Sequence, residues 1–266
     1  MAYGRVLVTG ASQGIGRAIA ETMLAEGWGV VATCRAPDKL APADRLDGVT
    51  YLAFEATDPQ ATAELARQAG EVDVLINNAG ASPIGPAEEA LPAKVREHFQ
   101  LNLFSAIQLT QAILPGMRER RQGTVIFIGS MRSEAPSPFS SLYSASKAAI
   151  RSFAQCLRME VEEYGIKVCV IAPIFIRTRL GQELLMRTGS PYAAAVDRVR
   201  ASRARQIAAA APAGVVARTV LSILRARRPR PLYFSGRFAR LQGFLTQHLS
   251  RSGVEAIMAR RFNLKG

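Results

Sequence analysis

The stretch Thr9-Gly10-Ala11-Ser12-Gln13-Gly14-Ile15-Gly16 directly follows the apolar run Val6-Leu7-Val8. The pattern predicts a buried strand over Arg5–Thr9 and a helix over Gly14–Gly27. Between such elements, glycines let the backbone turn tightly and bring N–H groups and the positive helix end against a phosphate. The spacing is G-x-x-x-G-x-G rather than G-x-G-x-x-G, and a glycine cluster alone is a weak signal. Its position between a strand and a helix favours a dinucleotide-binding loop.

Apolar strands alternate with helical segments along the chain. Further strands are predicted at Gly29–Cys34, Val49–Phe54, Val72–Asn77, Thr124–Ile128 and Lys167–Ala172, and further helices at Pro59–Ala69, Pro86–Arg120 and Ser140–Tyr164. Continuous apolar strands are buried on both faces, as in a parallel sheet covered by helices. The expected fold class is therefore α/β, a doubly wound parallel sheet in a Rossmann-like three-layer α/β/α arrangement. Residues 1–266 are expected to form a single domain, with a substrate lid at about 179–215 and a basic C-terminal extension at about 225–266.

Length and composition suit a soluble globular protein of one large domain, with 266 residues and 48% hydrophobic content. The N-terminus lacks the pattern of a secretory signal, and the longest apolar run, Val168–Ile176, is interrupted by Pro173. A cytoplasmic location is the simplest expectation. The three cysteines and two histidines have no metal-ligand spacing, so no metal site is expected: Cys34, Cys156, Cys169, His98 and His248.

The net charge of +13 is concentrated in the last quarter of the chain. Fifteen of the 34 Lys/Arg residues lie from Arg198 onward, together with a single acid, Glu255. Such a segment could face nucleic acid, anionic lipid or an acidic partner protein. Only five of the basic residues are lysines, so much of the arginine can reflect genomic composition. A solvated basic surface is the simpler interpretation, and no nucleic-acid partner is expected.

Tyr143-Ser144-Ala145-Ser146-Lys147 places a phenol and an ammonium one helical turn apart. A tyrosine hydroxyl titrates at a pH of about 10 in water, and a lysine at i+4 favours the phenolate by Coulomb attraction. The pair can therefore serve as a general acid–base catalyst. A Tyr/Lys pair at this spacing is also common on solvated helices, so the interpretation depends on the rest of the chain.

The glycine loop, Asn77-Asn78-Ala79-Gly80, Ser130 and Tyr143-x-x-x-Lys147 together resemble the short-chain dehydrogenase/reductase family. The resemblance covers roughly Arg5 to Leu180, with the elements in the family's order and spacing. It implies that Tyr143 is the general acid in carbonyl reduction and the base in the reverse reaction. Lys147 would hold the nicotinamide ribose hydroxyls and lower the pKa of the tyrosine.

The resemblance also implies roles for Ser130 and Asn102. Ser130 would donate a hydrogen bond to the substrate oxygen. Its position after a strand and its spacing to Tyr143 favour it over the neighbouring serines Ser133, Ser137, Ser140 and Ser141. Asn102 matches the position that anchors a water relay to the lysine. Alternatively, Asn102 is a polar residue that satisfies a local kink in a helix.

The cofactor contacts implied by the resemblance fall into three groups. Those to the pyrophosphate and ribose are Gly10, Ser12, Gln13, Gly14, Ile15 and Gly16. Those to the adenosine half are Glu55, Ala56, Asn78, Ala79 and Gly80, and those to the nicotinamide half are Tyr143, Lys147, Pro173, Ile176 and Thr178.

NADP(H) is favoured over NAD(H) by the residues that end the second strand. NAD enzymes of this kind usually have an acid there, whereas this chain has Cys34 and then Arg35. A guanidinium is well suited to bind a 2′-phosphate. The alternative is that Arg35 is simply a solvated surface residue.

Two residues depart from the family's usual pattern. Ile174 follows Pro173 where glycine is usual, and a branched side chain does not take positive φ cheaply, so a reshaped turn is expected beside the nicotinamide. Glu55 stands where aspartate usually faces the adenine, so either its longer side chain reaches or Asp58 takes its place.

The substrate is expected to be a hydrophobic ketone, aldehyde or alcohol. Apolar residues in the predicted lid either line the pocket or pack the lid itself: Leu180, Leu184, Leu185, Met186 and Tyr192. The tail from Pro229 to Gly236 loosely resembles retinol- and steroid-type reductases. In the helix that follows, three arginines alternate with apolar residues: Arg237, Arg240, Arg251, Phe238, Leu241, Phe244, Leu245 and Leu249. This helix could pack on the domain or a sister subunit, contact a membrane surface, or dock an acyl-carrier protein or coenzyme A ester.

NADPH-dependent carbonyl reduction, or the reverse oxidation, is the function predicted first. A 3-oxoacyl-thioester reductase is the alternative enzyme. A dinucleotide-sensing protein without catalysis is the alternative of another class, although such proteins typically lose the tyrosine or lysine. A homodimer or homotetramer is expected, because long helices commonly pair between subunits in this family.

Overall fold

A computed structural model describes residues 3–178, 183–236 and 251–261, together with positions 239, 241 and 243. Its main sheet has seven strands in the order β3-β2-β1-β4-β5-β6-β9, and every neighbouring pair is parallel. The strands are β1 Tyr3–Val8, β2 Trp28–Cys34, β3 Val49–Ala53, β4 Val74–Asn77, β5 Gly123–Ile128, β6 Ile166–Pro173 and β9 Leu232–Ser235. The predicted doubly wound parallel sheet is confirmed. The chain order reverses between β1 and β4, where such sheets bind their ligands.

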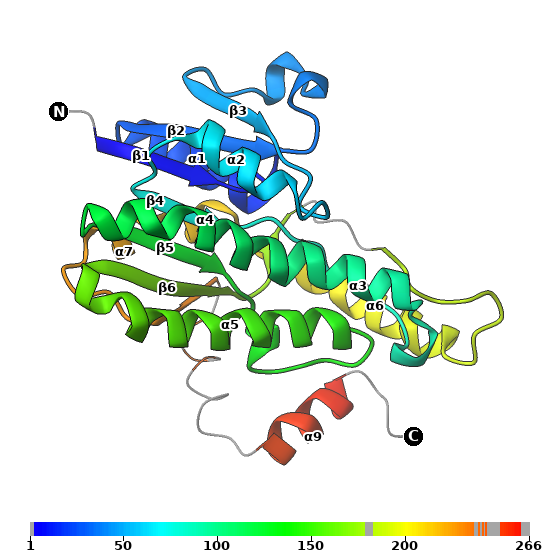
Figure 1. Ribbon diagram of the computed structural model, residues 1–266. Coiled ribbons are helices and arrows are strands. Elements are labelled where there is room, and N and C mark those ends of the chain that lie inside the picture. The colour runs from blue at the N-terminus through cyan, green and yellow to red at the C-terminus, as the bar shows by residue number, and fades with distance from the viewer. Residues whose placement is uncertain are drawn as a thin grey trace.

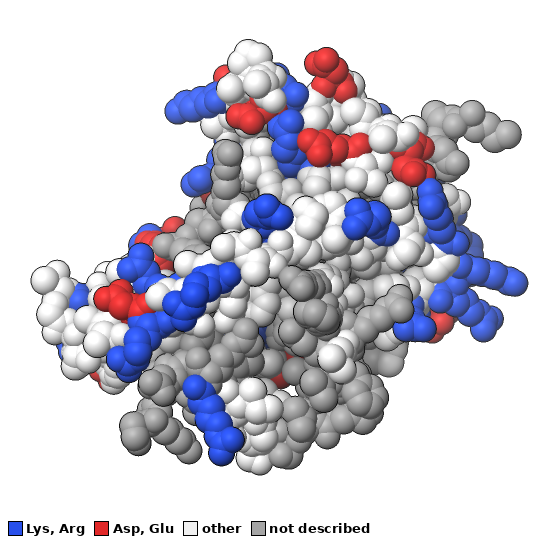
Figure 2. Space-filling view, turned by 180° about the vertical axis from the view of Figure 1, so that it is seen from behind, with Lys and Arg blue, Asp and Glu red and all other residues white. Residues whose placement is uncertain are grey.

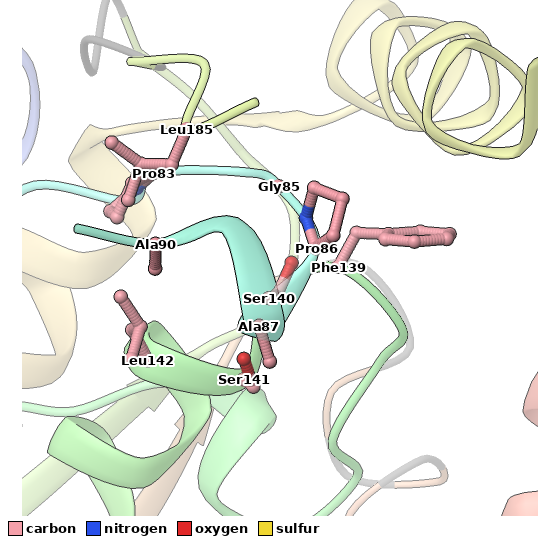
Figure 3. A pocket seen from close by; sticks show the side chains of 10 residues that line it. All are labelled: Pro83, Gly85, Pro86, Ala87, Ala90, Phe139, Ser140, Ser141, Leu142 and Leu185. Carbon is pink, nitrogen blue, oxygen red and sulfur yellow. The ribbon is translucent and has the colours of Figure 1, made fainter. Parts of the chain in front are cut away.

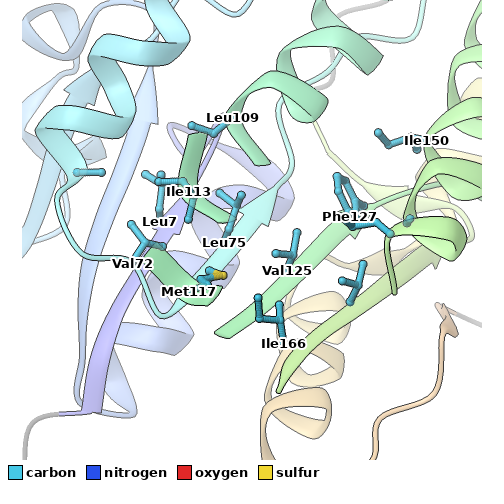
Figure 4. Close-up of a cluster of buried hydrophobic side chains, with 14 of the residues drawn as sticks. Leu7, Val72, Leu75, Leu109, Ile113, Met117, Val125, Phe127, Ile150 and Ile166 are labelled. Carbon is cyan, nitrogen blue, oxygen red and sulfur yellow. The ribbon is translucent and has the colours of Figure 1, made fainter. Parts of the chain in front are cut away.

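Helices cover both faces of the sheet and give the three layers visible in Figure 1. α2 Ala61–Ala69, α4 Ser105–Glu119 and α5 Ser141–Val161 pack on one face, and α1 Gly14–Ala25 and α7 Gly214–Arg225 pack on the other. Successive strand residues point to opposite faces. Accordingly, Leu7, Leu75, Val125 and Phe127 lie in the first core, shown in Figure 4. Their apolar chain neighbours lie in the second core: Val6, Val8, Val74, Ile76, Ile126 and Ile128.

The helix predicted over Pro86–Arg120 is not continuous. A turn at Ala87–Glu89 precedes α3 Pro92–Phe99, and a π-helical turn at Gln100–Phe104 separates α3 from α4. Single π-turns inside helices are frequent at functional sites. This one contains Asn102, so the prediction of an unbroken helix was wrong at the residue where a local kink had been considered.

The C-terminal part adds β7 Ile176–Arg177, β8 Ala211–Pro212, α6 Ala193–Ala208 and α9 Arg251–Arg261. β9 extends the sheet beside β6 and was not among the predicted strands. Short 3-10 turns lie at Pro37–Lys39, Pro42–Asp44, Met131–Ser133 and Glu162–Tyr164. Leu180 in the predicted lid, and Arg237, Arg240, Phe238, Phe244, Leu245 and Leu249 in the predicted amphipathic helix, lie outside the described residues.

Basic side chains lie over the projecting lobe that contains α6 and again at the opposite edge of the molecule (Figure 2). The α6 sequence carries Arg198, Arg200, Arg203 and Arg205. Within the described part of the chain, no helix is both long and apolar enough to cross a membrane.

Candidate active site

A cleft of about 720 Å³ opens at the carboxyl ends of the strands. It brings together predicted residues from seven separate parts of the sequence. The predicted site residues that line it are Gly10, Ser12, Gln13, Gly14, Ile15, Arg35, Glu55, Ala56, Asn78, Ala79, Gly80, Ser130, Tyr143, Lys147, Pro173, Ile176 and Thr178. Asn102 and Gly16 are the two predicted residues that do not line it.

The glycine loop is shaped by close approaches of backbone to backbone. Gly10 has φ +65°, and a Cβ there would lie 3.0 Å from the Cα of Ala79. A Cβ on Gly16 would lie 2.4 Å from the carbonyl oxygen of Gly10. Gly16 therefore lets α1 start directly beneath the loop, rather than facing the cleft. No side chain caps the N-terminus of α1 at Gln13, so its first N–H groups are available to an anion.

The loop is tied to the end of β4 by a set of short hydrogen bonds. Thr9 Oγ1 accepts from the backbone N–H groups of Asn78 and Ala79 at 2.9 and 3.0 Å. Asn78 Nδ2 donates to the carbonyl oxygens of Thr9 and Gly10 at 2.8 and 3.0 Å. Asn78 thus holds the phosphate loop and the adjacent strand end in one arrangement, a role that can accompany a cofactor contact.

Asn102 reaches toward the site from behind Ala79–Ala81. Its side chain accepts from the N–H of Ala81 and donates to the carbonyl of Ala81, both at 2.8 Å. Gly80 lies between this amide and the Lys147 ammonium, because a Cβ on Gly80 would lie 3.2 Å from Asn102 Oδ1 and 3.7 Å from Lys147 Nζ. The Asn102 amide therefore holds the backbone at Ala81, next to the glycine that approaches Lys147, and its role in a water relay stays a prediction.

A buried histidine extends this network. His98 Nε2 lies 3.1 Å from Ser146 Oγ, and Ser146 Oγ donates to the carbonyl oxygen of Tyr143 at 2.9 Å. Burial lowers the pKa of His98 to about 4, so its ring is neutral at physiological pH. The start of α5, which carries Tyr143, is thereby held against α3.

Lys147 is buried at the bottom of the cleft, with 6% of its surface exposed. Its Nζ donates to the carbonyl oxygen of Ile128 at 2.8 Å and lies 5.9 Å from the centre of the Tyr143 ring. Burial lowers the pKa of Lys147 to about 8. The Tyr143/Lys147 pair therefore lies in the cleft, rather than on a solvated helix face.

Ser130 follows β5 by two residues and is the N-cap of the 3-10 turn at Met131–Ser133. Its Oγ accepts from the N–H of Arg132 at 3.1 Å, so the hydroxyl proton is not used in that bond. Of the five serines considered, Ser130 alone lines the large cleft. Ser140 and Ser141 instead line a cavity of about 10 Å³ beside the Pro83–Ala90 loop (Figure 3), which has space for about one water.

At the adenosine end, Cys34 and Arg35 line the cleft at the end of β2. Glu55 also lines it, and its carboxylate accepts from the N–H and hydroxyl of Thr57 at 3.1 and 2.6 Å. Asp58 does not line the cleft and caps Gln60 instead, at 2.9 Å. Of the two acids considered for this end, Glu55 is the one in position.

The turn after Pro173, at the end of the cleft predicted to hold the nicotinamide, has one residue in the left-handed region. The positive φ falls on Phe175, at +41°, rather than on Ile174. Ile174 is buried at 2% exposure, and its N–H donates to the carbonyl oxygen of Ser235 at 2.8 Å. A bulky residue at positive φ is strained and persists only where its surroundings hold it.

The cleft is also lined by residues that were not predicted as site residues: Met131, Arg132, Arg203, Ile207, Val254 and Ile257. The described lid residues Leu184, Leu185, Met186 and Tyr192 do not line it. Leu184 forms a bridge with Ile84, and Tyr192 packs on Phe139 with ring centres 6.1 Å apart. Leu184 and Tyr192 therefore pack the lid against Ile84 and Phe139, whereas residues of α6 and α9 line the cleft. No cluster of metal-ligating side chains occurs among the described residues.

Comparison with known proteins agrees with this geometry. The family described as short chain dehydrogenase matches residues 5–188. This chain belongs to the short-chain dehydrogenase/reductase family. It is 39% identical over 202 residues to "Dehydrogenase/reductase SDR family member 7B" of Mus musculus, a match covering 71% of this chain and 62% of the mouse protein.

Two further members of the family resemble this chain. The "3-ketodihydrosphingosine reductase" of Bacteroides thetaiotaomicron is 34% identical over 172 residues, covering 63% of this chain and 62% of that protein. The chain thus spans about three fifths of the length of both relatives. A crystal structure of a short-chain dehydrogenase from Streptomyces avermitilis superposes with a TM-score of 0.81 at 32% identity, covering 98% of this chain and 99% of that one.

Proposed function

We propose that this chain is an NADPH-dependent carbonyl reductase that converts a hydrophobic ketone or aldehyde to an alcohol, or catalyses the reverse oxidation. One observation carries the proposal: Ser130, Tyr143 and Lys147 line the same cleft as the glycine loop. A proton donor, a buried cation and an oxyanion donor thus adjoin a dinucleotide site.

The residues of the cleft fit a nicotinamide dinucleotide. The floor of the cleft lies against glycines at which an added Cβ would collide with backbone atoms. The uncapped N-terminus of α1 suits a pyrophosphate. The contact residues predicted from the sequence, from Gly10 in the glycine loop to Thr178 after β7, would hold the dinucleotide. When bound, the cofactor supplies the hydride for reduction or accepts it in oxidation.

The side chains of this chain handle the proton and the developing charge. In reduction, Tyr143 gives its hydroxyl proton to the carbonyl oxygen as that oxygen becomes negative. The ammonium of Lys147 stabilises the phenolate that remains, and Ser130 donates a hydrogen bond to the same substrate oxygen. Asn102 and His98 act through position, by holding the backbone beside Lys147 and the start of α5.

NADPH is the proposed form of the cofactor, because Arg35 lines the adenosine end of the cleft. A guanidinium binds a 2′-phosphate through charge-assisted hydrogen bonds. The only carboxylate at that end among the described lining residues is Glu55, which is already bonded to Thr57.

The second candidate is reduction of a 3-oxoacyl thioester. It is supported by the basic α6 at the mouth of the cleft, which suits an acidic carrier, and by the size of the cleft. The Bacteroides relative is named for reduction of a 3-keto sphingoid base. This name supports the broader class of 3-keto substrates and does not distinguish the two candidates.

The test compares wild type with Tyr143→Phe and Arg35→Asp in a panel of ketones, with NADPH and NADH as reductants. Tyr143→Phe should abolish turnover, because it removes the proton donor, and should leave NADPH binding intact. Arg35→Asp should weaken NADPH binding much more than NADH binding. A wild type that binds NADPH but reduces no carbonyl would favour the sensing alternative, and equal losses for the two cofactors would remove the role of Arg35.

A further inference from the structure

Arg203 lies on α6 and lines the cleft together with Ile207, Val254 and Ile257, a part of the cleft that we call the substrate end. Its Nη2 donates to the hydroxyl of Ser82 at 2.7 Å. Ser82 is fully buried and directly follows Ala81, the residue that Asn102 holds from behind. One nitrogen of the guanidinium is therefore fixed against the floor of the site.

Within the described residues, no Asp or Glu forms an ion pair with Arg203. Burial lowers the pKa of its guanidinium, and Tyr143 acts in the opposite direction, which places Arg203 within electrostatic reach of the catalytic phenol. A partly buried cation without a carboxylate is costly unless a ligand supplies the acceptor.

The walls around Arg203 are apolar. Ile207 lies one turn further along α6, and Val254 and Ile257 extend from α9. Ile257 is 51% exposed, so the apolar surface continues from the cleft toward solvent. The substrate end thus combines a cation close to the catalytic tyrosine with apolar walls farther out.

We propose that Arg203 is a substrate-binding residue that accepts carbonyl compounds bearing a second oxygen acceptor near the reacting carbonyl, such as 3-oxo esters, thioesters or acids. The guanidinium donates to the second oxygen while Tyr143 and Ser130 bind the first. The apolar remainder of the substrate extends along Ile207, Val254 and Ile257. This inference rests on the proposed carbonyl reduction and names its substrate class.

The experiment uses two substrates of equal chain length, a 3-oxo ester and the ketone in which methylenes replace the ester group. The full-length enzyme is compared with Arg203→Met, which keeps length but removes charge, and with Arg203→Lys, which keeps charge but removes the fork. Arg205→Met is the matched control, because Arg205 is an exposed arginine on the same helix.

Arg203→Met should lower kcat/KM for the oxo ester by about ten- to a hundredfold, the range for a charge-assisted hydrogen bond, and change that for the plain ketone by less than about twofold. Arg203→Lys should recover part of the loss, and Arg205→Met should leave both values unchanged. Thermal unfolding and NADPH titration of each variant check that the fold and the cofactor site survive.

A role limited to holding α6 on the floor of the site gives a different pattern. Ser82→Ala removes the anchor but keeps the cation, so a purely positional role predicts equal losses for both substrates in Ser82→Ala and Arg203→Met. That outcome would overturn the inference while leaving carbonyl reduction intact. A wild type that reduces neither substrate, nor any other ketone, would instead overturn the proposed function and this inference with it.

Discussion

Lys147 keeps an ammonium where water hardly reaches, and this has a thermodynamic consequence. Burial lowers its pKa from 10.5 to about 8, so the folded protein holds the proton less tightly than the unfolded chain. In the interval between these values the unfolded state binds more protons, and stability therefore rises with pH. This lowering of the pKa means that the charged lysine reduces the free energy of unfolding by roughly 3 kcal/mol at neutral pH. The hydrogen bond to Ile128 offsets a part of it.

Lys147→Met should therefore be inactive and yet more stable than wild type in the absence of cofactor, by about 2 kcal/mol at pH 7. The difference should shrink as the pH rises from 8 toward 10.5, because the wild-type lysine loses its proton in the folded state. Urea unfolding of both proteins at several pH values measures this. A variant that is less stable than wild type at pH 7 would contradict the account.

The loop between β1 and α1 leaves no room for a side chain at Gly16. Gly16 has ordinary helical backbone, but a Cβ would lie 2.4 Å from Gly10 O and 2.9 Å from Ala11 Cα. Both neighbours are backbone, so neither can move without moving the loop. Gly116, within α4, differs: a Cβ would meet only the flexible end of Arg120, at 3.2 Å.

Gly16→Ala should destabilise the fold by about 1–3 kcal/mol and weaken NADPH binding at least tenfold, because the amide groups of the loop shift together. Gly116→Ala, the matched control, should gain about 0.5–1 kcal/mol from its lower chain entropy and leave NADPH affinity unchanged. Cofactor titration and thermal unfolding of the two variants provide the comparison. Equal affinities would show that the loop tolerates the displacement.

Elements set by local signals were predictable from the sequence, and those set by distant contacts were not. β1, β2, β4, β5 and β6 read as apolar runs, and the family motifs brought Ser130, Tyr143 and Lys147 to one cleft. The interruption of the helix at Asn102 depends on hydrogen bonds to Ala81. The position of Arg203 depends on Ser82, 121 residues away in the chain. The residue pattern within the Ala/Arg-rich segment cannot predict a hydrogen bond to a residue so far away in the chain.

At the scale of the whole molecule, the C-terminal part supports the nicotinamide end of the cleft. β9 pairs with β6 from Val170 to Pro173, and the N–H of Ile174 donates to Ser235. Gly236 follows with φ +129°, and a Cβ there would lie 2.3 Å from the carbonyl oxygen of Ile174. The strained turn at Phe175 is therefore held from the far side by residues about sixty positions later in the chain.

Gly236→Ala should destabilise the protein by about 3 kcal/mol and reduce turnover, because relief of the clash moves the Ile174 peptide that adjoins the cleft. Gly189→Ala provides the control: its φ is also positive, at +72°, but nothing lies within 4 Å of the added Cβ. It should lose only about 1 kcal/mol and keep wild-type turnover. Urea unfolding measures the loss of stability, and steady-state kinetics measure the loss of turnover. Similar losses in both variants would show that the positive φ, rather than the clash with Ile174, causes them.

The position of β9 in the chain also affects the order in which the strands can pair during synthesis. Because β6 ends at Pro173 and its outer partner begins at Leu232, a growing chain emerges from the ribosome with β6 complete and one of its edges unpaired. An unpaired apolar strand edge is a template for wrong pairing. While the intervening residues are being synthesised, this edge of β6 has no native partner, and it is covered only after Leu232–Ser235 have emerged and paired with it.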